Sequence, residues 1–185
     1  MESYQIKFLV YGLKEYYSNA EDTEKVIINC ALVAAGADAV GGIIPGLAIP
    51  AVIASCFGAV WVMYGKLCDT LGISLKENVL KLLAKAVIAN IAANLGGALA
   101  AIFVGMFIPG ASIFVSAAVT FITVYLAGIV FLALILKMAE NSSDLHTFSD
   151  ISEEDMMKTV NETKLSKEDL KEAKNVYNQN KNGKK

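Results

Sequence analysis

Three polar side chains stand inside otherwise apolar stretches of this chain of 185 residues, and they are its first candidates for chemistry. Asp38 is the single acid in such a stretch, and Asn90 and Asn94 stand one helical turn apart in another. A charge at the centre of a bilayer costs about 2.5–3.5 kcal/mol on insertion scales, so an acid there is a candidate for ion or proton handling. Amides in lipid also bond across helices, typically for about 0.6–2 kcal/mol. Two hypotheses follow for these residues: structural polar contacts between helices, or the lining of a permeation path.

Catalytic and metal-binding motifs are absent from the sequence. The single histidine, His146, stands beside Asp144 in a polar linker with no nucleophile motif near it. There is no Gly-x-Ser-x-Gly, no phosphate-binding glycine loop and no metal-spaced cluster. The three cysteines, Cys30, Cys56 and Cys68, lack CxxC spacing and fit buried apolar positions. We therefore predict a protein that is not an enzyme and that holds no cofactor and no metal.

The composition and the placement of charge favour a membrane protein. Apolar residues make up 55% of the chain and charged residues 18%, against roughly 45–50% and about 25% in soluble domains. Residues 86–136 are 51 consecutive uncharged positions, which a bilayer accommodates more simply than a soluble fold of this size. All sixteen basic residues are lysine, a usage typical of a bacterial genome of low GC content. Without arginine, and without a basic patch among aromatics, nucleic-acid binding is not expected.

Each of the two uncharged stretches contains the same tripeptide. Ile44-Pro45-Gly46 stands in residues 39–65, and Ile108-Pro109-Gly110 stands in residues 86–136. Proline lacks the N–H donor and glycine favours an open backbone, so this pair does not continue a helix. The sequence thus predicts two helix–turn–helix hairpins, with Pro45, Gly46, Pro109 and Gly110 in the turns. A shift of 64 residues superposes the two tripeptides, which indicates an internal repeat.

The fold that we expect is an all-α integral membrane helical bundle with four transmembrane-like helices. Each expected span is near the ~17–25 residues that cross a bilayer, and the spans run over residues 26–42, 47–65, 86–107 and 111–136. The expected parts of the chain are an N-terminal amphipathic helix and linker (1–25), the apolar membrane domain (26–137) and a soluble helical tail (138–185). Within the membrane domain, a charged cytoplasmic loop (66–85) separates the hairpins 26–65 and 86–137.

Lysine placement predicts the orientation of these spans. The N-terminus, residues 66–85 and the C-terminal segment contain lysine, whereas the two Pro-Gly turns have none nearby. By the positive-inside rule, both termini and the central loop are cytoplasmic. We expect a multi-pass protein of the bacterial inner membrane, with the lipid bilayer as its partner.

Local signals predict where some helices begin and end. Gly72 can close one helix and Ser74 can open the next. The stretches Ser152–Asp155 and Ser166–Asp169 resemble capping boxes at the starts of two further helices. The last of these helices has a thin apolar stripe, too narrow for a core of its own, so it packs on a partner or stays frayed. The stripe consists of Leu170, Ala173 and Tyr177.

A ladder of small residues recurs every four positions in the third expected span. Such ladders let helix backbones approach closely in lipid. We expect a close helix contact there, within the chain or between chains, and a homo-oligomer. The ladder consists of Ala89, Ala93, Gly97, Ala101 and Gly105.

The run from Ala31 to Gly72 resembles a known family. Small residues precede Ile44-Pro45-Gly46-Leu47-Ala48-Ile49-Pro50-Ala51, and Trp61, Tyr64-Gly65 and Leu71-Gly72-Ile73 follow in a similar order. Over residues 26–137 the chain looks like the bacterial YcjF-like, GTPase-associated domain of unknown function. The resemblance implies a membrane-associated helical module of unassigned biochemical role. Because this chain has no GTPase domain, the resemblance also implies that a GTPase would be a separate cytoplasmic partner.

Three functional hypotheses follow. The leading one is a non-enzymatic scaffold, anchor or membrane-shaping protein that self-associates or recruits a cytoplasmic partner. The second is an oligomeric pore or transport accessory with Asp38, Asn90 and Asn94 in its path. The third is a soluble helical bundle whose hairpins bury against each other.

Overall fold

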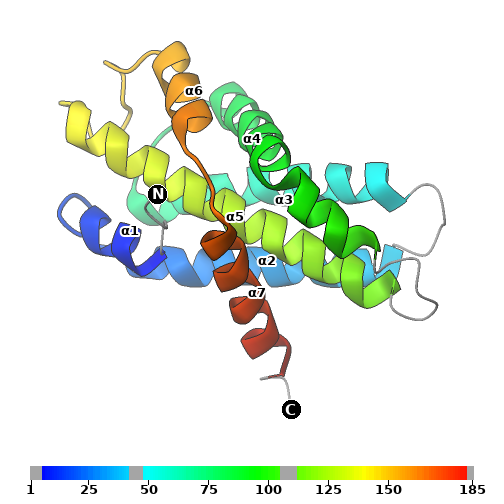
Figure 1. The fold of residues 1–185 in the computed structure, drawn as a ribbon. Helices are drawn as coiled ribbons and strands as arrows, with labels where there is room; N and C mark the ends of the chain where they lie inside the picture. Colours follow the sequence, from blue (N-terminus) through cyan, green and yellow to red (C-terminus); the bar gives the residue numbers. More distant parts are fainter. Residues whose placement is uncertain (1–5, 42–47, 105–111, 183–185) are drawn as a thin grey trace.

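The computed structural model describes residues 6–41, 48–104 and 112–182, with side chains described at 6–37, 56–95 and 117–180. Within these residues the fold is all-α, as the sequence predicts, with seven helices and no strand. The helices are α1 (Ile6–Leu13), α2 (Asp22–Gly41), α3 (Ala48–Leu71), α4 (Glu77–Val104), α5 (Ser112–Asn141), α6 (Glu153–Glu162) and α7 (Lys167–Asn182) (Figure 1). The predicted turn residues Pro45, Gly46, Pro109 and Gly110 lie outside the described residues.

The end of α3 is closed by a glycine that the sequence singles out. Gly72 adopts a φ of +71°; its N–H donates to the carbonyl of Asp69 (3.3 Å), and the N–H of Ile73 donates to the carbonyl of Cys68 (2.8 Å). Glycine reaches this left-handed conformation without the steric cost of a Cβ. The stretch 66–85, expected as a charged loop, is therefore helical except at residues 72–76.

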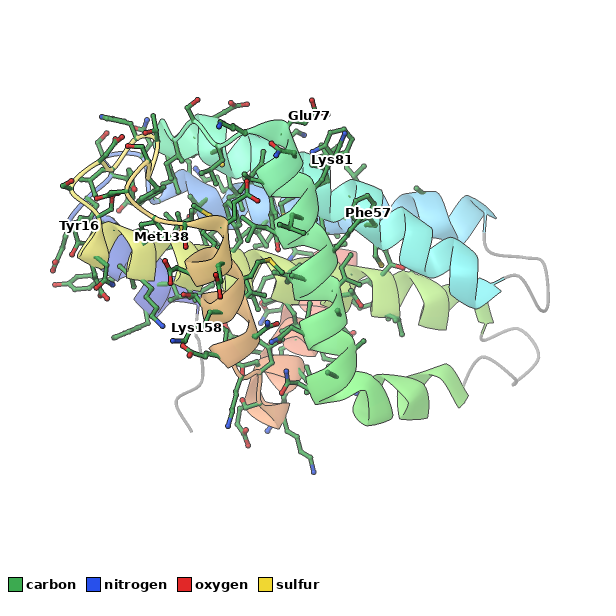
Figure 2. All side chains as sticks on the ribbon, turned by 90° about the horizontal axis from the view of Figure 1, so that it is seen from above. Tyr16, Phe57, Glu77, Lys81, Met138 and Lys158 are labelled. Atoms are coloured by element: carbon green, nitrogen blue, oxygen red, sulfur yellow. The ribbon has the colours of Figure 1, made fainter. Side chains whose placement is uncertain are left out.

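The four long helices α2, α3, α4 and α5 meet at one end of the bundle. The C-terminal ends of α2 and α4 and the N-terminal ends of α3 and α5 lie together at the right of Figure 1. α4 crosses the bundle in its first part and then bends toward that end (Figure 2). Adjacent small residues are common where helices bend, and α4 contains Gly96-Gly97. We call residues 39–41, 48–55, 96–104 and 112–116 the uncharged end, because none of them is charged.

α5 forms the centre of the hydrophobic core. It packs against each of the other described helices, and 94% of the most apolar 18-residue window within Ala117–Asn141 is buried inside the protein. Tyr64 of α3 stacks on Phe131 with ring centroids 4.1 Å apart, and its hydroxyl donates to the carbonyl of Ala127 (3.1 Å). The most apolar helix of the chain is thus enclosed by protein along most of its length.

Two glycines allow neighbouring helices to approach α5 closely. A Cβ on Gly128 would lie 2.7–2.8 Å from three side-chain atoms of Ile27, and a Cβ on Gly12 would lie 3.0 Å from Cδ2 of Leu136. Ile27 is fully buried, so α2 and α5 touch at Gly128 without room for a methyl group. These close contacts place α1 and α2 on α5.

Two described stretches are long and apolar enough to cross a membrane. They are Glu77–Leu95 in α4, with 19 residues, and Ala117–Asn141 in α5, with 25. A buried core helix of a soluble protein has the same length and composition, and the α5 stretch is buried whereas only 50% of the α4 stretch is. The arrangement of four spans therefore stays a prediction.

The expected N-terminal amphipathic helix is α1, and it docks on protein. Its buried side consists of Ile6, Leu9, Val10 and Leu13. Phe8 and Tyr11 point away from the core and are 70% and 71% exposed. Just after the helix, the hydroxyl of Tyr17 donates to the carbonyl of Leu145 (3.0 Å). The start of the chain is thus joined to the segment that follows α5.

Candidate functional site

Asn90, one of the predicted polar candidates, joins α4 to the end of α6. Its side chain is buried, and its amide nitrogen donates to the carbonyls of Val160 (2.8 Å) and Thr163 (3.2 Å). The last carbonyls of a helix have no partner within the helix, and α6 ends at Glu162. The end of α6 is therefore closed by the amide of Asn90 together with the N–H of Thr163, which donates to the carbonyls of Thr159 (3.1 Å) and Val160 (3.3 Å).

Asn94 supports this contact from one turn further along α4. Its amide nitrogen donates to the backbone carbonyl of Asn90 (2.9 Å) and to the side-chain Oδ1 of Asn90 (3.1 Å). Because Oδ1 of Asn90 accepts this bond, the NH₂ group of Asn90 faces α6. The pair thus forms a structural polar contact, the first of the two hypotheses for these residues.

α7 packs on α5 through the thin apolar stripe. The ring of Tyr177 lies with its centroid 5.2 Å from that of Phe121, in a tilted arrangement. Leu170 and Ala173 are buried, and Val176 is partly buried against the same core. The partner that the sequence requires for this helix is therefore α5 of the same chain.

Both C-terminal helices begin with the capping boxes that the sequence indicates. At α6, the N–H of Asp155 donates to Oγ of Ser152 (3.1 Å), and that hydroxyl donates to the Asp155 carboxylate (2.6 Å). At α7, the carboxylate of Asp169 accepts from the N–H of Ser166 (2.7 Å) and from its hydroxyl (2.6 Å). These bonds satisfy N–H groups at each helix start. We call residues 153–182, which comprise α6, its connection and α7, the C-terminal cover.

Acidic side chains of α7 and α2 influence each other beside the contact between α7 and α5. Burial raises the pKa of Glu172 above its usual value, Asp169 and Glu24 of α2 raise it further, and Lys7 of α1 lowers it. The buried hydroxyl of Tyr125 has no hydrogen-bond partner among the described residues. This side of the junction contains more negative than positive charge, so apolar packing and the Asn90 bonds hold the cover in place.

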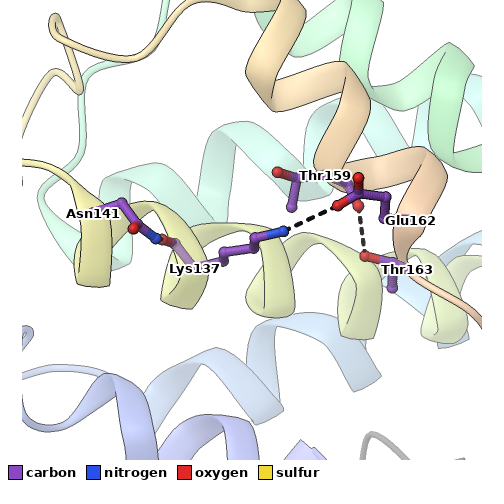
Figure 3. A network of polar contacts seen from close by, with 5 residues as sticks. All are labelled: Lys137, Asn141, Thr159, Glu162 and Thr163. Atoms are coloured by element: carbon purple, nitrogen blue, oxygen red, sulfur yellow. Dashed lines mark hydrogen bonds and ion pairs between the residues drawn. The ribbon is translucent and has the colours of Figure 1, made fainter.

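A polar pocket of about 350 Å³ lies between the C-terminal part of α5 and α6. Nζ of Lys137 is 3.2 Å from Oε2 of Glu162, and both side chains are 51% exposed. Nearby, the hydroxyl of Thr163 donates to the carbonyl of Thr159 (2.9 Å), and the amide of Asn141 donates to the carbonyl of Lys137 (2.6 Å) (Figure 3). Exposed ion pairs contribute about 0–1 kcal/mol. With both signs of charge exposed, the pocket selects no particular ligand.

The linker after α5 is organised by the carboxylate of Asp144. It accepts from the N–H groups of His146 (3.0 Å) and Thr147 (3.1 Å), and hydrogen bonds from Thr147, then from His146, hold its pKa well below the usual range. The N–H of Ser74 donates to the carbonyl of His146 (2.7 Å), and Nδ1 of His146 lies 3.1 Å from the carbonyl oxygen of Gly72. His146 thus ties the linker to the connection between α3 and α4.

An apolar groove of about 390 Å³ lies between α2 and α3. Val33 and Val62 line it and are 74% and 51% exposed. Gly58 also lines the groove, and a Cβ there would meet nothing within 4 Å. The groove is a surface of small and apolar side chains, with Lys66 as its charged member.

The other predicted site residues are placed in part. Asp38 belongs to α2, and Gly97 and Ala101 belong to α4, but their side chains lie outside the described ones; Gly105 lies outside the described residues altogether. Ala89 and Ala93 are exposed on α4. This part of the small-residue ladder therefore does not pack inside the chain.

No described group of three or more His, Cys, Asp or Glu side chains could hold a metal ion. The three cysteines are buried, as their surroundings in the sequence indicate. Comparison with protein-family models, curated proteins and solved structures finds no match to this chain.

Proposed function

We propose that this chain is a non-enzymatic membrane protein that anchors or scaffolds through the uncharged end of its bundle. The observation that supports this proposal is the convergence of four helix ends from residues 39–65 and 86–136, none of which is charged. Uncharged helix segments gathered at one end of the bundle are suited to a bilayer, because charged side chains are strongly disfavoured in hydrocarbon.

Charge placement supports a defined orientation. Lysines gather at the opposite ends of the long helices: Lys66 follows the uncharged part of α3, Lys81 and Lys85 precede that of α4, and Lys137 follows that of α5. Under the positive-inside rule the lysine-bearing ends of these helices face the cytoplasm, together with both termini. We propose a multi-pass arrangement in a bacterial inner membrane, with the two Pro-Gly turns on the far side.

Self-association and a cytoplasmic partner are parts of the same proposal. Ala89 and Ala93 are exposed small residues on α4, and small residues allow close packing between helices in lipid. The resemblance to the YcjF-like domain adds a separate GTPase as a candidate partner on the cytoplasmic side.

One alternative function has an observation in its favour. A soluble bundle is supported by the burial of 94% of the most apolar stretch of α5. The pore hypothesis has less support, because the Asn90 amide is used to close α6 and Asn94 is used to orient it.

Membrane fractionation with a matched pair of variants tests the proposal. Full-length protein in washed bacterial membranes should resist extraction by alkaline carbonate. Ile102→Lys places a charge in the uncharged end, whereas Leu82→Lys places the same charge on an exposed position of the same helix beside Lys81. A lysine at the bilayer centre costs about 2.5–3.5 kcal/mol, so the first variant should shift toward the soluble fraction and the second should not. Wild-type protein that stays in the supernatant without detergent would sink the proposal and favour the soluble bundle.

A further inference from the structure

The docked position of α7 limits how far α5 can enter a bilayer. α5 begins at Ser112, and Tyr177 of α7 packs on Phe121. The nine residues from Ser112 to Thr120 extend about 13 Å at 1.5 Å per residue. A hydrocarbon core is about 30 Å thick. With α7 in place, the part of α5 that precedes Phe121 reaches through less than one leaflet.

α7 cannot accompany α5 into the hydrocarbon. Six charged residues stand in its first eight positions, namely Lys167, Glu168, Asp169, Lys171, Glu172 and Lys174. Charged side chains are strongly disfavoured in the bilayer core. The docked structure and a membrane-spanning α5 therefore exclude each other.

The C-terminal cover buries five apolar side chains over its 30 residues, namely Met156, Val160, Leu165, Leu170 and Ala173. α6 buries Met156 and Val160, α7 contributes its thin stripe, and the Asn90 amide provides the buried hydrogen bonds from α4. By contrast, α2 packs closely on α5 where Ile27 contacts Gly128, and there is no room there for a Cβ on the glycine. Elements with few buried contacts open at lower free energy than the core.

We propose that the C-terminal cover is releasable and that the surface of α5 beneath it is a second lipid-contacting surface. With the cover docked, the uncharged end of the chain inserts into one leaflet. With the cover released into water, α5 spans the bilayer. The inference rests on the proposed membrane function, and it adds the release of the cover as the step between these two states.

The bilayer itself favours the released state. Release in water exposes the apolar face of α5 around Phe121 and Tyr125, which is unfavourable. In lipid the same face is buried, so only the released state gains from deep insertion. A ligand shifts an equilibrium by its differential affinity for the two states, and here the ligand is the acyl-chain layer.

Cysteine protection distinguishes the two states. Ala173 of α7 is fully buried while the helix is docked. Its neighbour Lys174 is exposed on the same helix. Ala173→Cys and Lys174→Cys are made in a chain whose three native cysteines are replaced by alanine. Each protein is produced by cell-free synthesis with and without vesicles of phosphatidylcholine and phosphatidylglycerol, and labelled with a membrane-impermeant maleimide.

The expected result is that Ala173→Cys is protected without vesicles and labelled at least about tenfold faster in the vesicle-bound fraction. Lys174→Cys should react equally fast in both. A protein that floats with vesicles while Ala173→Cys stays protected would overturn the release step and leave the membrane proposal standing. A protein that does not float overturns the membrane proposal itself.

Two further results would count against the docked form. Aggregation of the chain without vesicles, or fast labelling of Ala173→Cys in that state, would mean that the cover does not shield α5 in water. Addition of Asn90→Ala should raise labelling without vesicles about tenfold, because it removes the two buried hydrogen bonds from α4 to the end of α6. Asn94→Ala removes the bond that orients the Asn90 amide but not the bonds from Asn90 to α6, so it should raise labelling by less than Asn90→Ala.

Discussion

The contact of Gly128 with Ile27 gives the sharpest test of the fold. A Cβ at Gly128 would stand 2.7 Å from Cγ1, 2.8 Å from Cδ1 and 2.8 Å from Cγ2 of Ile27. Two of these atoms are bonded directly to the β-carbon of a fully buried, β-branched side chain, which has one preferred rotamer in a helix. Gly128→Ala should therefore force α2 and α5 apart.

Two opposing effects determine how much Gly128→Ala changes the free energy of unfolding. Overpacking of a well-packed core costs about 1–3 kcal/mol, and three simultaneous overlaps place this site near the upper value. Alanine recovers up to about 1 kcal/mol of helix propensity over glycine. We expect Gly128→Ala to lower the free energy of unfolding by about 2 kcal/mol, equivalent to a fall in Tm of about 4–8 °C for a chain of this size.

Gly65 provides the matched control. It also lies inside a long helix, and a Cβ there would meet nothing within 4 Å. Gly65→Ala should keep the propensity gain without a clash and raise Tm by about 2–4 °C. Thermal unfolding followed by circular dichroism, in one detergent or buffer for all variants, measures both.

A double-mutant cycle removes ambiguity about the cause. Ile27→Ala deletes all three overlapping atoms and by itself costs about 2–5 kcal/mol. In that background Gly128→Ala should become neutral or stabilising, a coupling of up to about 3 kcal/mol between the two positions. Equal effects of Gly128→Ala in both backgrounds, or a stabilising Gly128→Ala alone, would refute the packing of α2 on α5.

Three other perturbations follow from contacts of the cover and of the N-terminal segment. Asn90→Ala should destabilise the protein by about 1–3 kcal/mol, because two buried hydrogen bonds between α4 and the end of α6 are lost; an unchanged urea midpoint would contradict this role. The pKa of Glu172 is raised in the docked state, so docking strengthens as pH falls through that raised pKa toward the usual value of about 4.3. The ratio of the labelling rate of Ala173→Cys to that of exposed Lys174→Cys, whose thiol has the same intrinsic pH dependence, should therefore fall on acidification. Glu172→Gln should keep this ratio low at neutral pH and remove most of its pH dependence. Tyr17→Phe deletes the hydrogen bond to the carbonyl of Leu145 and should cost about 1 kcal/mol in urea unfolding, whereas no change would place that hydroxyl in water.

The sequence predicts local structure well where one residue type has one physical role. Gly72 closes α3 because only a residue without Cβ reaches its positive φ cheaply. Ser152 and Ser166 begin helices because their hydroxyls bond the third following N–H. Each of these signals depends on neighbours within four residues.

The sequence does not predict which apolar helix is enclosed by protein. The role of Asn90 depends on a carbonyl 70 residues away, and nothing in the surrounding residues indicates that partner. Gly128 could have been noticed as a glycine within a long apolar helix, where it costs about 1 kcal/mol relative to alanine. A glycine retained at such a position indicates a close approach, although the partner Ile27 is visible only in the folded chain.

Hydropathy cannot separate a protein-enclosed helix from a lipid-enclosed one, because both environments reward the same side chains. The helices that pack on α5 decide whether protein or lipid encloses it. α7 packs on α5, and its first eight residues include six charges. This contact reaches Phe121, near the uncharged end. In the docked form α7 therefore keeps lipid from α5 at Phe121. If the chain spans the membrane through α5, acyl chains must replace α7 where it now covers α5 around Phe121. An α5 that spans while Tyr177 still contacts Phe121 would require the charges of α7 to lie within the hydrocarbon, and a bilayer does not permit that.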